Sequence, residues 1–464
     1  MSTLYRCQIF TPPDKVNKLL NSIDYKQNLF GKKFLENSCG NGSVLIEVVS
    51  RYIKDCFKNK YSITKVRQGL QADIWGFEID KEKYNECIEN LNKTAKLFEI
   101  DNVNWNIIRA DYLEYENLPK FSYIAGNPPY RNYRDLPINI RSYVKNTFNT
   151  CNKGKFDYCY AFIEKSINDL DEEGRLAYLI PSSIFKNVFA KNLRNFILPH
   201  ITEIYDFKTE KVFDKALVAT SILVCKKNSN KSCLKYKNEE NNKLNKIEKK
   251  QLGNKWLFNN QNTNGNCKFG DHFRASISIA TLLNNAFVLD ENTSINIESE
   301  VTKPAKSPRN LAYSKKEKII FPYFYENDTL KRYSEDDFKN KFPKAIAYLE
   351  RKKEALNKRN KDVSAKWFEY GRSQALSHLN QEKLLISTVI TDSIKVYELE
   401  KEDIPYAGIY ITSLNGTPLD KAKEILTSNS FLEYVNNIGI QASGTSLRIT
   451  PKDINNFEFD IEEI

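Results

Sequence analysis

The sequence predicts an α/β protein with a mixed, mostly parallel sheet of seven strands, followed by a separate α+β domain. Short apolar runs alternate with amphipathic helical runs through residues 1–230, which is typical of βα units. Polar residues follow successive predicted strands, at the edge where open α/β sheets bind ligands. From Lys226 to about Lys255, Lys, Asn and Glu dominate, which indicates a boundary between domains 1–230 and 231–464. The predicted strands lie within residues 33–43, 74–80, 104–110, 121–126, 174–181, 201–207 and 217–226.

The composition excludes several classes of protein. The nine cysteines form no C-x-x-C pair and only three histidines are present, so we expect no metal site and no Cys–His nucleophile. No run is long enough to span a bilayer and the first residues lack an apolar signal core, so we expect a cytoplasmic protein without membrane contact. The net charge of +11 suits a polyanionic partner, although a lysine-rich, AT-biased genome would also produce it.

The first predicted element is a capped helix. Thr11 is the expected N-cap, Pro12 occupies the first helical position, and residues 16–23 are amphipathic. The segment is either an ordinary capped helix or also a source of free backbone N–H groups for a carboxylate ligand.

A strand, a glycine turn and a helix follow between residues 33 and 56. Gly40 and Gly42 allow the backbone to approach a ligand closely. The turn lacks the third glycine of a dinucleotide fingerprint, and Glu36 would repel a pyrophosphate. The Glu36 carboxylate suits the ammonium group of an amino-acid moiety instead, although two glycines alone are weak evidence.

Two more acids follow the next two predicted strands. Glu78 lies one βα unit after the glycine turn, where ribose hydroxyls are bound. Asp111 suits an adenine amino group, with Tyr112 or Ile79 packing against the ring. Each acid alone would be an ordinary solvated charge. Three in succession, with Asn127 after the fourth strand, indicate one binding site.

The fourth strand ends in Asn127-Pro128-Pro129-Tyr130. The two prolines prevent helix continuation and ladder hydrogen bonding, so Asn127 is held stiffly just beyond the strand. The Asn127 side chain and the Pro128 carbonyl group are acceptors, and Tyr130 adds an aromatic face, which together suit a planar base with an exocyclic amino group. The alternative is a proline-rich turn next to an ordinary core tyrosine.

Two later segments contain candidate nucleic-acid contacts. Residues 131–154 are predicted as a long loop with interleaved basic and aromatic residues, which suits phosphates and bases, although a solvated connector can have the same composition. Phe213 lies in another connector and either packs locally or stacks on an extruded base. After residue 255 the sequence predicts a charged helix over 344–359 and short strands at 383–390 and 406–411.

These motifs, in this order, resemble the gamma-group amino-methyltransferases of bacterial type II restriction–modification systems, which methylate adenine N6 in DNA. The turn Ser38-Cys39-Gly40-Asn41-Gly42 departs from the commoner loop of that family. The segments that carry the resemblance are Gln8–Pro13, Glu36–Gly42, Glu78–Ile79, Asp111–Tyr112, Asn127–Tyr130, Phe213, Trp367–Arg372 and Gly444–Asn456.

The resemblance implies a Rossmann-like S-adenosylmethionine-dependent methyltransferase domain at residues 1–230 and a target DNA recognition domain at 231–464. It implies that double-stranded DNA is the partner, that any cognate restriction endonuclease is a separate chain, and that the enzyme is a monomer. It implies that Tyr130 and Phe213 stack on the flipped adenine. The catalytic residues are then Asn127, Pro128, Pro129 and Tyr130, and the cofactor contacts are Thr11, Pro12, Glu36, Ser38, Cys39, Gly40, Gly42, Glu78, Ile79, Asp111 and Tyr112.

Other interpretations are open at this stage. The four-residue motif also occurs in shorter glutamine-specific protein methyltransferases, so protein or RNA is an alternative substrate. A specificity subunit with a vestigial cofactor fold is opposed by the intact acids and Asn127. A nuclease fusion would have little room in this chain. Cytosine N4 is disfavoured because that chemistry usually pairs with Ser at position 127.

Overall fold

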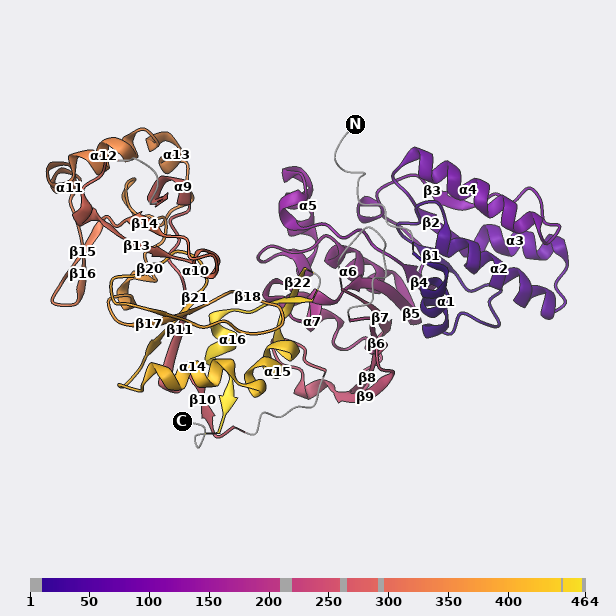
Figure 1. The fold of residues 1–464 in the computed structure, drawn as a ribbon. Helices are drawn as coiled ribbons and strands as arrows, with labels where there is room; N and C mark the ends of the chain where they lie inside the picture. Colours follow the sequence, from indigo (N-terminus) through magenta and orange to yellow (C-terminus); the bar gives the residue numbers. More distant parts are fainter. Residues whose placement is uncertain (1–10, 209–218, 259–264, 291–295, 444, 461–464) are drawn as a thin grey trace. The chain divides into compact units, whose positions relative to one another are not determined.

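The computed structural model describes residues 11–208, 219–258, 265–290, 296–443 and 445–460. The chain divides into two compact units, Met1–Asn260 and Gln261–Ile464 (Figure 1). Each unit has its own sheets and its own apolar core.

The first unit is built on a nine-stranded sheet with the order β3-β2-β1-β4-β5-β7-β6-β8-β9. The strands from β3 to β5 run parallel, and β7 is antiparallel to both of its neighbours, β5 and β6. The bounds are β1 Phe34–Glu36, β2 Ile74–Phe77, β3 Asn106–Ile108, β4 Phe121–Gly126, β5 Leu170–Pro181, β6 Ile201–Asp206, β7 Thr220–Lys226, β8 Cys233–Asn238 and β9 Lys243–Glu248.

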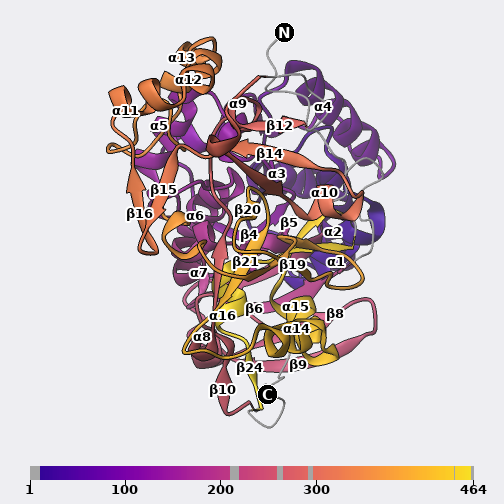
Figure 2. The ribbon, with the colours of Figure 1, turned by 60° about the vertical axis from the view of Figure 1, so that its left-hand side comes forward.

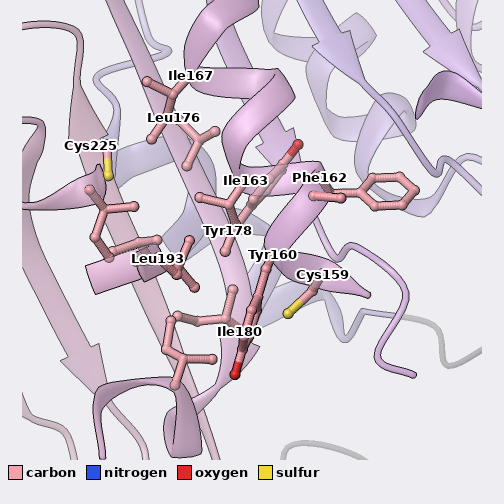
Figure 3. Close-up of a cluster of buried hydrophobic side chains, with 14 of the residues drawn as sticks. Cys159, Tyr160, Phe162, Ile163, Ile167, Leu176, Tyr178, Ile180, Leu193 and Cys225 are labelled. Atoms are coloured by element: carbon pink, nitrogen blue, oxygen red, sulfur yellow. The ribbon is translucent and has the colours of Figure 1, made fainter. Parts of the chain in front are cut away.

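Helices cover both faces of this sheet because its central strands are apolar on both sides. Along β5, Leu176 and Tyr178 belong to one core and Ala177 and Leu179 to the other, which is the two-residue period of a strand. Ile163 and Ile167 of α6 lie against this first pair (Figure 3). One face packs on α1 Pro13–Ser22, α2 Ser43–Lys58, α3 Ile63–Asp73 and α4 Lys81–Lys96, and the other on α5 Ile138–Thr147, α6 Cys159–Asp169 and α7 Lys191–Ile197.

All seven predicted strands are present, but the sheet continues beyond them. The strands β8 and β9 come from the polar stretch that we assigned to a domain boundary, and they extend the sheet at its β6 edge. Leu234 and Tyr236 are the buried residues of β8, and Ile247 is the buried residue of β9. The first unit therefore ends at Asn260 rather than at residue 230. Edge strands need few apolar residues, so the polar composition concealed them.

Three helical details differ from the prediction. The segment 131–154, expected to be a loop, contains the helix α5. Val144 is the only buried residue of this helix. The expected helix 184–198 begins only at Lys191, because two 3₁₀ turns, Ser182–Phe185 (η5) and Val188–Ala190 (η6), come first. The N-cap of α1 is Pro12 rather than Thr11, and Pro13 takes the first helical position.

The second unit consists of small sheets and short helices. Two four-stranded sheets have the orders β11-β21-β17-β19 and β12-β14-β13-β20, and α14 and α15 lie side by side (Figures 1 and 2). Its strands are β10 Cys267–Lys268, β11 Phe273–Ile277, β12 Val288–Asp290, β13 Thr302–Lys306, β14 Glu317–Ile320, β15 Tyr323–Glu326, β16 Thr329–Arg332, β17 Lys383–Ile386, β18 Val389–Ile390, β19 Tyr397–Leu399, β20 Ile404–Pro405, β21 Ile409–Ser413, β22 Ile440–Ser443, β23 Ser446–Arg448 and β24 Glu458–Phe459. Its helices are α8 Phe269–His272, α9 Asn284–Phe287, α10 Pro308–Ala312, α11 Glu335–Lys341, α12 Pro343–Glu350, α13 Lys353–Asn357, α14 Leu419–Thr427, α15 Asn429–Ile438 and α16 Pro451–Asn455.

The predicted helix 344–359 is two helices, α12 and α13. The backbone of Lys352 leaves the helical region (φ −115°), and its ammonium group donates to the carbonyl of Asn285 at 2.7 Å. The strands predicted at 383–390 are present as β17 and β18.

Over the described residues, no helix is long and apolar enough to cross a membrane. The same part of the chain contains no cluster of three or more His, Cys, Asp or Glu side chains that could hold a metal ion. Its cysteines are free thiols, most of them buried.

Candidate active site

The candidate site lies where the parallel strands β3, β2, β1 and β4 end. The register pairs Phe34 of β1 with Ile74 of β2 and with Tyr123 of β4, so these strands end at one edge of the sheet. The predicted acids and the Asn127 segment follow directly, and the fold therefore brings them to the same edge.

The glycine turn after β1 is fastened to the neighbouring strand. The N–H of Cys39 donates to the Phe77 carbonyl at 2.9 Å, and the Gly42 N–H donates to the Cys39 carbonyl at 2.7 Å. Gly42 has φ +87°, and a Cβ atom there would lie 2.9 Å from Cys87 Sγ. Only glycine satisfies both conditions, and α2 begins at the next residue, so its free N–H groups lie under the turn.

Glu36 and Glu78 are both buried next to this turn. The Glu78 carboxylate accepts hydrogen bonds from the N–H groups of Gly40 and Asp80, each at 2.8 Å. Burial nevertheless raises the pKa of Glu78. Burial also raises the pKa of Glu36 well above its usual value, and Glu36 Oε2 has no hydrogen-bond partner among the described residues.

Asp111 caps the short 3₁₀ turn Tyr112–Glu114 (η2) by accepting from the Leu113 N–H at 2.9 Å, and it also accepts from the Tyr158 hydroxyl at 3.4 Å. Burial raises its pKa as well. Ile79 is 52% exposed, so its side chain is available to a ligand. Tyr112 is not at the surface: it is 1% exposed, with its ring packed between Phe77 and Phe162.

The Asn127–Tyr130 segment is joined to the glycine turn. Ser38 Oγ donates to the Asn127 carbonyl at 3.1 Å. A Cβ atom on Gly126 would lie 3.2 Å from Glu36 Cγ, so the acid lies beside the end of β4. The Asn127 Oδ1 atom and the Tyr130 hydroxyl are buried, whereas the remainder of Tyr130 is partly exposed. Glu36 and Ser38 of the glycine turn therefore lie next to the Asn127–Tyr130 segment.

A buried polar network below this edge was not predicted from the sequence. Asn37 Nδ2 donates to Ser166 Oγ at 2.8 Å and to the Tyr178 hydroxyl, and these two hydroxyl oxygens are 2.7 Å apart. The Tyr112 hydroxyl lies 3.2 Å from Ser166 Oγ and donates to Asp169 Oδ2 at 2.8 Å. Tyr112 therefore connects the Asp111 turn to the residue after Glu36. Of these residues only Asn37 could have been suspected from the sequence, because it lies between Glu36 and the glycine turn.

Two predicted site residues, Thr11 and Phe213, remain to be placed. Thr11 is buried just before α1. Phe213 lies outside the described residues.

Three acids at this edge have no cationic partner among the described residues. Among the described residues, none of Glu36, Glu78 and Asp111 takes part in an ion pair. Buried carboxylates without cations disfavour anions such as a pyrophosphate and favour a cationic ligand that donates hydrogen bonds. S-adenosylmethionine fits this donor set, because it combines an ammonium group, a sulfonium, a ribose and an adenine. The first unit has a Rossmann-like α/β fold, with helices on both faces of a mostly parallel sheet.

Comparison with known proteins shows which methyltransferases this chain is similar to. Residues 27–213 match the family described as Eco57I restriction-modification methylase. The type II restriction enzyme and methyltransferase RM.Eco57I of Escherichia coli is 24% identical over 79% of this chain and 47% of its own length. The type II methyltransferase M.AccI of Acinetobacter calcoaceticus is 32% identical over 36% of this chain and 30% of its own length. This chain is thus similar to restriction–modification methylases, and it spans less than half the length of these two relatives.

Solved structures support the fold over nearly the whole chain. The type IIL restriction-modification enzyme MmeI, solved in complex with DNA, matches 98% of this chain and 69% of its own chain, with a TM-score of 0.63 and 13% identity. The DrdV–DNA complex matches 96% of this chain and 56% of its own, with a TM-score of 0.57 and 13% identity. At such low identity the likeness concerns the fold.

Proposed function

We propose that this chain is a gamma-group DNA methyltransferase of a restriction–modification system. It transfers the methyl group of S-adenosylmethionine to the N6 amino group of an adenine extruded from double-stranded DNA. The observation that carries the proposal is the hydrogen bond between Ser38 Oγ and the Asn127 carbonyl at 3.1 Å, which joins the Asn127 segment to the glycine turn beside the buried Glu36.

The acids account for the parts of the cofactor. Glu36 would accept from its ammonium group, Glu78 from the ribose hydroxyls and Asp111 from the adenine amino group, with Ile79 against the adenine ring. Thr11 and Pro12 precede α1, whose first N–H groups suit the cofactor carboxylate. Ser38, Cys39, Gly40 and Gly42 shape the turn around it. Tyr112 would hold the Asp111 turn from below. When bound, the cofactor supplies an electrophilic methyl group.

The Asn127 segment accounts for the acceptor. The adenine amino group is a weak nucleophile because its lone pair is delocalised into the ring. Its two N–H groups would donate to the Asn127 side-chain oxygen and the Pro128 carbonyl, which favours a pyramidal nitrogen with its lone pair free to attack. Pro129 keeps this corner stiff. The faces of Tyr130 and Phe213 would stack on the base and offset its extrusion by about 1–3 kcal/mol each.

The remaining parts of the proposal concern partners. The second unit would recognise the target DNA sequence, which follows the order of the gamma group: N-terminal helix, cofactor turn, catalytic segment, recognition region. Relatives of this chain are named as type II methyltransferases, and the MmeI and DrdV structures contain DNA. We further propose a monomeric, cytoplasmic enzyme whose cognate endonuclease, if one exists, is a separate chain.

The test is methylation sequencing of DNA from a host that lacks N6-methyladenine and expresses this chain. Wild-type protein should mark adenine in one short sequence, and Asn127→Ala should leave the DNA unmarked while still binding S-adenosylmethionine. A tritiated-cofactor filter assay against DNA, RNA and protein separates the substrate classes. A folded, cofactor-binding wild-type protein that labels RNA or protein but not DNA would refute the proposal.

A further inference from the structure

Two adjacent apolar side chains are exposed beside the catalytic edge. Val188 is 66% exposed and Phe189 is 43% exposed, and both belong to the 3₁₀ turn η6. This turn lies in the segment that leaves β5, and β5 is the parallel neighbour of β4, with Tyr178 paired to Gly126. The apolar pair therefore belongs to the connection that leaves the same edge of the sheet as Asn127.

The backbone that carries this pair is held from beneath. Arg194 is buried, and its guanidinium donates to the carbonyls of Ile184 at 2.7 Å and Asn187 at 2.8 Å, and to that of Asn254. The Asn187 side chain accepts from the Phe189 N–H at 3.0 Å. A preorganised apolar projection loses little conformational entropy when it is covered.

A neighbouring loop supports the aromatic ring. A Cβ atom on Gly154 would lie only 2.3 Å from the Phe189 ring, so the ring lies directly against this glycine. Asn192 Nδ2 of α7 donates to Asn152 Oδ1 at 2.8 Å, which ties the same loop to the helix after η6. The loop 152–155 and the turn 188–190 thus form one continuous surface.

This surface is cationic as well as apolar. Lys153 and Lys155 flank Gly154 and are exposed, and Lys191 is exposed at the start of α7. None of these three lysines forms an ion pair within the described parts of the chain. Unpaired lysines around an apolar tip favour a polyanion with apolar faces over a protein partner.

We propose that Val188 and Phe189 form a wedge that enters the base stack of duplex DNA next to the extruded adenine, while Lys153, Lys155 and Lys191 bind the flanking phosphates. This inference rests on the proposed function. Extrusion of a base leaves a gap between its neighbours, and apolar side chains are known to insert between base steps in minor-groove DNA-binding proteins. Phe189 offers an aromatic face to the bases on either side.

The test uses a duplex with the target sequence found by methylation sequencing, with 2-aminopurine in place of the target adenine. Its fluorescence rises when the base leaves the stack. Phe189→Ala should reduce this rise, and the single-turnover methylation of the normal duplex, by about 10-fold. On a duplex whose target adenine faces an abasic site, the variant should methylate nearly as fast as wild type, because no base pair has to be broken for extrusion. Val188→Ser should produce the same defect in a milder form. Because Val188 is largely exposed, this substitution should not disturb folding.

Three controls complete the design. Phe189→Leu keeps an apolar tip and should retain most of the fluorescence rise. Leu97→Ala removes another exposed apolar side chain, 82% exposed after the end of α4, and should change nothing. Lys153→Glu should weaken duplex binding and lower its salt dependence with little effect on the rate at saturation.

The outcomes separate the two proposals. If wild-type protein methylates DNA but Phe189→Ala and Val188→Ser keep the full fluorescence rise, the wedge is refuted alone, and the surface serves a protein partner or none. A defect that persists opposite an abasic site would also refute the wedge, because it would reflect misfolding. If wild-type protein neither extrudes nor methylates adenine, both proposals fail.

Discussion

Two buried glutamates, one in each unit, have opposite surroundings. Glu369 of the second unit is 1% exposed, and its carboxylate receives both the Nε and the Nη2 groups of Arg332 and the Lys366 N–H. Glu36 of the first unit is 3% exposed, but among the described residues its Oε2 has no hydrogen-bond partner. Both side chains are buried, but in the described parts of the chain only Glu369 has a cationic partner.

The difference distinguishes a structural acid from a binding acid. The Glu369 hydrogen bond raises the pKa of Arg332, as expected where both charges stabilise each other. Burial raises the pKa of Glu36 well above its usual value, so its ionised form destabilises the cofactor-free protein. A cationic ligand would relieve that penalty. The segment Trp367–Arg372, expected to belong to the recognition region, contributes its aromatic residues to the core of the second unit.

The largest expected effect tests the polar edge itself. Asn127→Ala should lower the rate of methyl transfer by about 100- to 1,000-fold, as loss of a preorganised polar group does in other enzymes. Calorimetry with S-adenosylmethionine should show little change in its affinity. Retained turnover would show that the Asn127 edge of the first unit is not the catalytic site.

The paired acid should be the more costly one for stability. Glu369→Gln should lower the free energy of unfolding by about 2 kcal/mol, because the buried site loses its charge-assisted hydrogen bonds while the exposed Arg332 guanidinium stays solvated. Chemical denaturation of the full chain measures the change. An unchanged midpoint would mean that the pair contributes no more than an ordinary surface ion pair.

The unpaired acid should respond with the opposite sign. Glu36→Gln should raise the free energy of unfolding of the cofactor-free protein by about 1–2 kcal/mol, because a neutral amide is less costly to bury. The same variant should bind S-adenosylmethionine about 10-fold more weakly, because a charge-assisted hydrogen bond is lost. Lower stability together with unchanged affinity would contradict both assignments.

A pH titration sharpens the same contrast. A pKa raised in the folded state means that the stability contributed by Glu36 is complete below the ordinary glutamate pKa and is lost as pH rises through the raised value. Cofactor affinity should change in the other direction and rise over that window, since the carboxylate form binds the ammonium group. Comparison of wild type with Glu36→Gln isolates the contribution of the Glu36 carboxyl group. If stability and affinity depend on pH in the same way in both proteins, Glu36 is not the titrating group.

The smallest effect concerns a neutral group at the same edge. The Tyr130 hydroxyl is buried with no hydrogen-bond partner in the described part of the chain. Tyr130→Phe should raise the free energy of unfolding by about 1 kcal/mol, because an unsatisfied polar atom is removed. Methylation of duplex DNA should persist, since the ring face remains. A large loss of activity would instead assign the hydroxyl a direct contact with the base.

Much of the first unit could be predicted because its signals are local. The apolar runs, the glycine turn and the proline-rich corner each occupy a few consecutive residues, and their strands occur where expected. The helix α5 and the strands β8 and β9 were missed because each buries only one or two side chains, which leaves almost no periodic signal. The interruption before α7 depends on Asn187 as a cap and on Arg194 as a clamp, which no window of residues reveals.

The sequence by itself determined which chemical groups follow each parallel strand, and therefore which groups share one edge, because βα units align the carboxyl ends of their strands. Tertiary structure alone decided which of these groups are satisfied. Arg332 donates to Glu369, which lies 37 residues away in the sequence, and Asn37 donates to Ser166, which lies 129 residues away. Hydrogen bonding and desolvation depend on such distant neighbours, so only the folded chain separates a buried acid that stabilises a core from one that awaits a ligand.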